Sequence, residues 1–66
     1  MEIELNGKSF QCTDGQNLAT LVEILELTGK AVAVAVNRQV VQSKNWSQHL
    51  LKAQDKVDVV RAIGGG

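Results

Sequence analysis

The sequence predicts a single α+β domain in which one helix lies across one mixed β-sheet of four or five strands. The chain has 66 residues, which is enough for one small domain and too few for two. An apolar fraction of 44% with 21% charged residues is typical of a folded globular chain. One stretch has helical periodicity and the others alternate like strands, and a single helix can cover only one face of one sheet.

The first dozen residues predict a β-hairpin. Apolar Ile3 and Leu5 alternate with glutamates up to Asn6-Gly7, a dipeptide typical of two-residue hairpin turns because both residues tolerate positive φ. This turn places Ile3 opposite Phe10 and gives the hairpin one apolar face. That face carries Met1, Ile3, Leu5, Phe10 and Cys12. Cys12 is therefore expected in the core.

An amphipathic helix is predicted over residues 18–27. Its apolar residues recur at the i, i+3, i+4, i+7 spacing of one helix face, and they are Leu18, Leu21, Val22 and Leu25. Asn17 has the character of an N-cap residue, and Gly29 is expected to leave the helix with positive φ. The handedness of crossover connections predicts a parallel partner for the next strand, either a hairpin strand or the final strand.

Two strands are predicted after the helix. In KAVAVAVN, residues 30–37, the valines share one side and the alanines the other, as in a strand in mid-sheet. A turn at residues 37–39 leads to a short strand at Val40-Val41. SKNWSQHL then predicts a capped helical turn or loop that folds Trp46 and Leu50 inward.

The final strand lies in KVDVVRAI, residues 56–63. Alternation turns Val57 and Val59 inward, which leaves Val60 as an apolar side chain on the outer face. We therefore expect Val60, with Ala62 and Ile63, to form a docking surface for a partner.

Three glycines close the sequence, and they predict a flexible tail at residues 64–66 beyond a domain at 1–63. The segment from Ala62 to Gly66 reaches about 14 Å when extended, and it is slender enough to enter a narrow channel. The α-carboxylate of Gly66, with a reference pKa of about 3.5, is anionic at neutral pH and needs activation before it reacts.

Composition argues against several classes of function. Phe10 and Trp46 are the only aromatic residues, so few rings are available to stack on bases, and we expect no nucleic acid among the partners. Residues 1–29 carry one basic and five acidic groups, net −4, whereas residues 30–66 carry six basic and two acidic groups, net +4. His49 has no ligand partners at metal spacing. A lone cysteine and the absence of a long apolar run predict a cytoplasmic protein that does not bind membranes.

Several segments together match one family pattern. They are the hairpin around Asn6-Gly7, DGQNL at 14–18, AVAVN at 33–37 with Val40-Val41, Trp46, and the ending VVRAIGGG. In this combination the chain resembles the ThiS family of sulfur carriers over essentially its whole length. The resemblance implies a ubiquitin-like β-grasp fold. Gln42 and Gln54 depart from the family pattern, which usually has proline and glycine at these positions.

The resemblance also implies a role in making the thiazole half of thiamine. A ThiF-type enzyme would use ATP and Mg²⁺ to adenylate Gly66, while Gly64 and Gly65 let the tail enter its active site. A sulfur donor such as a cysteine desulfurase would then leave a thiocarboxylate on Gly66, and a ThiG-type thiazole synthase would take the sulfur. On this reading the chain is a non-catalytic co-substrate, monomeric when free, that binds no cofactor or metal itself.

Three alternatives remain open from the residues. A sulfur carrier for molybdopterin synthesis would share the fold and the terminal chemistry. A ubiquitin-like modifier would form isopeptide bonds through Gly66. A plain β-grasp binding module would have a tail with no chemical role.

Overall fold

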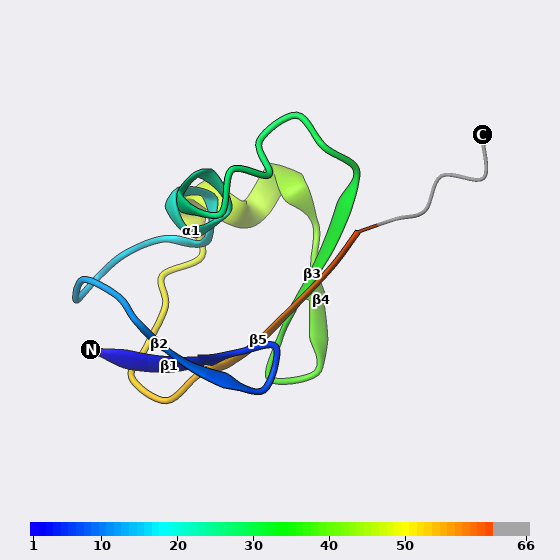
Figure 1. The fold of residues 1–66 in the computed structure, drawn as a ribbon. Helices are drawn as coiled ribbons and strands as arrows, with labels where there is room; N and C mark the ends of the chain where they lie inside the picture. The colour runs from blue at the N-terminus through cyan, green and yellow to red at the C-terminus, as the bar shows by residue number, and fades with distance from the viewer. Residues whose placement is uncertain (62–66) are drawn as a thin grey trace.

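The computed structural model describes residues 1–61. Its elements in chain order are β1 (Glu2–Leu5), β2 (Lys8–Gln11), α1 (Leu18–Ile24), β3 (Val32–Val36), β4 (Gln39–Val41), the 3₁₀ helix η1 (Ser43–Gln48) and β5 (Lys56–Arg61). The helix α1 lies across one face of the sheet, as predicted (Figure 1). The expectations for Ala62, Ile63 and the glycines at 64–66 fall outside the described residues.

The five strands form one mixed sheet in the order β2-β1-β5-β3-β4. The first and last strands, β1 and β5, pair in parallel, and the other neighbours are antiparallel. The prediction of a parallel partner for the strand after the helix is wrong, because β3 pairs antiparallel with both β5 and β4. The crossover from β2 through α1 does reach a strand of the same direction, but β1 and β5 lie between the two. The crossover rule governs handedness and does not require adjacency.

The predicted N-terminal hairpin is confirmed in its register. Ile3 lies opposite Phe10, and the two turn residues Asn6 and Gly7 have φ of 50° and 82°. Positive φ at both central positions defines a type I′ turn, whose twist matches that of the flanking strands. The fold therefore begins with a local element that its own turn residues specify.

A second two-residue turn joins β3 and β4. Asn37 and Arg38 have φ of 51° and 70°, and Gln39 already belongs to β4. Within β3, Val34 and Val36 are buried, whereas the side chains between them face the other side of the sheet. The predicted separation into a valine face and an alanine face is confirmed.

The helix α1 begins where the sequence predicts. The Asn17 side chain accepts a hydrogen bond from the Thr20 backbone N–H at 2.8 Å, which satisfies one of the free donors of the first turn. The apolar residues Leu18, Leu21 and Val22 are buried against the sheet.

The helix ends earlier than predicted, and Gly29 is not its C-terminal cap. It stops at Ile24, and Glu26 takes the left-handed conformation with φ of 60°. The Leu27 N–H then donates to the Val22 carbonyl at 3.1 Å, a bond of the Schellman motif, which places an apolar residue just after the left-handed one. Packing of Leu27 against the core thus sets the end of the helix, whereas Gly29 lies in the following turn.

One buried cluster between α1 and the sheet forms the core. Its members are Ile3, Cys12, Leu18, Leu21, Val22, Val34, Val36, Leu51 and Val57. The prediction that Cys12 lies in the core is confirmed, since its exposed fraction is 8%.

The segment around η1 closes the core at one end, and here one prediction is wrong. Trp46 packs against the core as expected, and its Nε1 donates to the Val41 carbonyl at 2.8 Å. Leu50, however, is 59% exposed, whereas Leu51 is 3% exposed. The Leu51 N–H donates to the Gln16 carbonyl at 2.8 Å. The chain is extended there, so successive side chains alternate and Leu51 takes the inward position.

Gln54 supplies a test of backbone strain. Its φ is 68°, a conformation that costs a side chain about 1–2 kcal/mol. We expect Gln54→Gly to raise the free energy of unfolding by about 0.5–1 kcal/mol, because relief of this strain exceeds the added freedom of the unfolded chain. Urea unfolding followed by circular dichroism would measure the change. Gln54→Ala is the control and should not share the gain; an unchanged midpoint for the glycine variant would contradict the argument.

Candidate functional site

An apolar patch lies on the outer face of the sheet, away from α1. Val60 is 61% exposed and Val40 is 73% exposed. Ala33 pairs with Val60, and Ala35 pairs with Val40, so the four side chains lie on neighbouring strands and face the same side. We call Ala33, Ala35, Val40 and Val60 the apolar patch. Because β5 carries Val60, the patch lies close to the end of the described chain.

The structure thus places one of the three predicted docking residues and adds three that the sequence analysis missed. Val60 faces outward as predicted, and its docking role stays a prediction, whereas Ala62 and Ile63 lie outside the described residues. The sequence feature that could have identified Val40 is the Val40-Val41 pair. Side chains alternate along a strand, so one of two successive valines must face outward. The two alanines become part of the patch only because β3 is flanked by β4 and β5.

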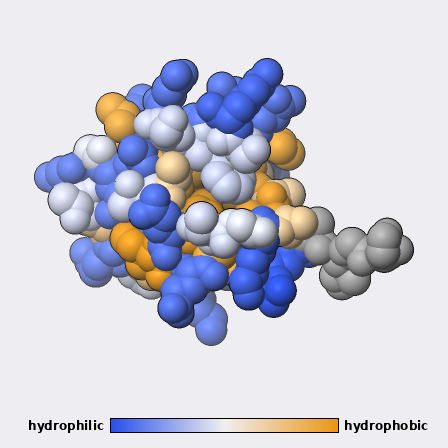
Figure 2. All heavy atoms as spheres, turned by 90° about the horizontal axis from the view of Figure 1, so that it is seen from above, coloured by the Kyte–Doolittle hydropathy of each residue, from blue (hydrophilic) through white to orange (hydrophobic). Residues whose placement is uncertain are grey.

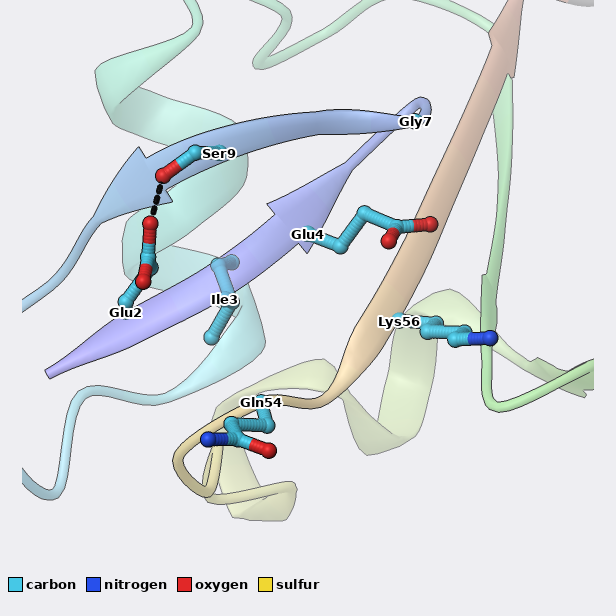
Figure 3. Close-up of a pocket in the computed structure, with 7 residues that line it drawn as sticks. All are labelled: Glu2, Ile3, Glu4, Gly7, Ser9, Gln54 and Lys56. Carbon is cyan, nitrogen blue, oxygen red and sulfur yellow. Dashed lines mark hydrogen bonds between the residues drawn. The ribbon is translucent and has the colours of Figure 1, made fainter.

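The other half of the outer face is mainly acidic. Glu2 and Glu4 project from β1, and Asp58 projects from β5 beside the apolar patch. The Ser9 hydroxyl donates a hydrogen bond to the Glu2 carboxylate, and Lys56 lies in register with Glu4. Glu2, Glu4, Ser9 and Lys56 line an open groove of about 330 Å³, and Figure 3 shows how these four side chains lie. The outer face therefore joins an apolar surface to a polar one with net negative charge.

Exposed apolar side chains also occur away from the sheet's outer face. Ile24 on α1 is 53% exposed, and Leu50 is 59% exposed. Figure 2, which views the molecule from the top of Figure 1, shows hydrophobic surface interrupted by polar side chains. Ile24 therefore offers a comparison position of similar character, carried on the helix.

Cys12, the one cysteine of the chain, is buried and poorly suited to nucleophilic chemistry. Burial raises the pKa of the Cys12 thiol, and the positive charge of the N-terminal ammonium group offsets part of that effect. A raised pKa lowers the thiolate fraction at neutral pH, so Cys12 is a poor nucleophile. Within residues 1–61, no three His, Cys, Asp or Glu side chains are grouped closely enough to hold a metal ion. That part of the chain also has no helix long and apolar enough to cross a membrane.

Comparison with known proteins identifies the family. The model of the ThiS family matches residues 3–66. The chain is 33% identical to the sulfur carrier protein ThiS of Escherichia coli (strain K12), and the match covers all of both chains. It is also 35% identical to part of a thiazole synthase from Magnetococcus marinus, where it covers 100% of this chain and 20% of that protein.

The fold agrees with this relationship. The crystal structure of a thiamine biosynthesis protein, ThiS from Geobacter metallireducens, superposes with a TM-score of 0.86 at 25% identity and covers 100% of both chains. The mixed five-stranded sheet with one main helix is therefore the ubiquitin-like β-grasp fold predicted from the family resemblance. The chain belongs to the ThiS family, the sulfur carrier proteins of thiamine biosynthesis.

Proposed function

We propose that the chain carries sulfur as a thiocarboxylate on Gly66. The observation that carries the proposal is the full-length match to a sulfur carrier protein, within which the family model extends to Gly66 itself. Glycines at 64 and 65 support it, because residues without side chains can pass through a channel that would exclude bulkier ones.

The proposed chemistry begins with activation of an inert carboxylate. A ThiF-type enzyme binds ATP and Mg²⁺ and transfers AMP to the Gly66 carboxylate, with pyrophosphate as the leaving group. The acyl-adenylate then has AMP as a good leaving group, and the terminal sulfur of a persulfide on a donor such as a cysteine desulfurase displaces it. A thiol then reduces the resulting acyl disulfide, which leaves the thiocarboxylate on Gly66 and a disulfide on the donor side. A ThiG-type thiazole synthase accepts the sulfur. The match to part of a thiazole synthase supports a partner of this type.

The chain would act as a co-substrate without catalytic groups of its own. The apolar patch would dock on the adenylating enzyme and deliver the terminal carboxylate to its active site, which turns an encounter in solution into a reaction at fixed distance. The acidic half of the outer face favours a partner with a basic rim, since complementary charge orients an encounter more than it tightens binding. We expect the carrier to act in the cytoplasm and to be monomeric when free.

The first prediction from this proposed function concerns the terminal chemistry. Incubation with a ThiF-type enzyme, ATP, Mg²⁺ and a sulfur donor should produce an adenylyl adduct and then exchange of one oxygen for sulfur. Intact-protein mass spectrometry would detect both species. A variant lacking Gly66 should stay unmodified. An unmodified full-length chain, under conditions where the E. coli relative reacts, would contradict the proposal.

The second prediction concerns where the sulfur resides. Because Cys12 is buried and its thiol pKa is raised, the transferred sulfur should not be carried by that side chain. Cys12→Ala should form the same thiocarboxylate, as seen by mass spectrometry, although loss of the buried sulfur lowers stability by about 1 kcal/mol. Loss of thiocarboxylate in a variant whose circular dichroism shows a native fold would assign the sulfur to Cys12 instead.

The third prediction concerns docking. Val60→Asp should lower kcat/KM for adenylation by about tenfold or more, because an apolar contact is lost and a charge must be desolvated. Ile24→Asp is a matched control, since Ile24 has similar exposure but lies on α1. Both variants should keep the circular-dichroism spectrum of the wild type. Equal losses in the two variants, or none in Val60→Asp, would contradict the assignment of the apolar patch.

A further inference from the structure

The backbone pairing of β1 with β5 stops before β5 ends. The last paired residues are Leu5 and Val57, after which β1 turns back at Asn6. The Asn6 N–H donates to the Val57 carbonyl at 2.8 Å. Its side-chain Oδ1 then accepts from the Val59 N–H, also at 2.8 Å. One side chain thus replaces the carbonyl that the departing strand no longer supplies and extends the pairing along β5.

Asn37 makes the corresponding contact at the start of β5, on the β3 side. Its N–H donates to the Lys56 carbonyl at 2.7 Å, and its Oδ1 accepts from the Lys56 N–H at 3.0 Å. Its Nδ2 also donates to Asp55 at 3.1 Å. Asn6 and Asn37 both occupy the first of the two central positions of a type I′ turn, with φ of 50° and 51°.

Both positions need two properties at once. The turn requires positive φ, which asparagine, aspartate and glycine tolerate more readily than other residues. The contact to β5 requires a short side chain with an oxygen acceptor. Glycine meets only the first requirement, whereas asparagine and aspartate meet both. Replacement by glycine therefore removes the contact to β5 and leaves the turn unstrained.

We propose that Asn6 is a positioning residue for docking, an inference that rests on the proposed function. Among residues 1–61, β3 is the one strand that pairs with β5 beyond Val57, and the Asn6 side chain supplies the contact on the other side. It holds Val59, and with it the neighbouring Val60 of the apolar patch. Without this contact, the end of β5 gains freedom that the partner must remove on binding, which weakens docking and leaves the chemistry of the bound complex unchanged.

The test compares Asn6→Gly, Asn6→Asp and Asn37→Gly. Asn6→Gly should speed hydrogen exchange of the Val59 amide, measured by NMR, by about two- to tenfold, the range expected for one exposed hydrogen bond. The KM for the carrier in adenylation should rise over a similar range of about two- to tenfold, with kcat unchanged. Asn6→Asp keeps the oxygen acceptor and should restore both values.

Asn37→Gly is the matched control, because it loses the same kind of bond at the other end of β5. It should speed exchange of the Lys56 amide and leave the KM for adenylation unchanged. Unchanged exchange at Val59 in Asn6→Gly, or an equal rise of KM in both glycine variants, would overturn the proposal. A wild-type chain that is never adenylated would instead contradict the proposed function, and the exchange rates would still decide whether Asn6 holds β5.

Discussion

The pairing of β5 with β1 on one side and β3 on the other is the constraint on which the structure depends. The strand order β2-β1-β5-β3-β4 means that the two hairpins of the sheet meet only through β5. The pairs that join them are distant in sequence, such as Glu4 with Lys56. Forming these pairs closes a loop of almost the whole chain. The conformational entropy lost in this closure must be offset by a stabilising interaction. The cluster beneath α1 supplies that stabilisation, since Val57 is buried among residues from both hairpins.

Successive side chains of β5 alternate between the core and the outer face of the sheet. Val57 and Val59 face α1 and contribute to the core, whereas Asp58 and Val60 face outward. A slip of one residue in register would bury the aspartate and expose the core valines, so the core fixes the composition of the outer face. The docking surface proposed for the carrier therefore depends on the stability of the fold, although its residues contribute little to the buried cluster.

Sequence reasoning succeeded where the determining interactions are local. The turn at Asn6-Gly7, the cap at Asn17 and the outward side of Val60 follow from a few neighbouring residues. It failed where distant packing decides. The end of α1 depends on Leu27 reaching the core, and the inward turn of Leu51 depends on its bond to Gln16. The apolar patch was found only in part, because its members share a surface only once β3 and β5 are neighbours.

The arrangement around β5 also has a mechanical consequence. A pull along the axis of β5 from its C-terminal end loads the ladders to β1 and β3 together, since hydrogen bonds on both sides lie across the direction of force. These bonds must then break in shear as a group. A pull on the edge strand β4 would instead separate its three pairs with β3 from one side. The domain therefore resists a force along β5 more strongly than a force that peels away the edge strand β4.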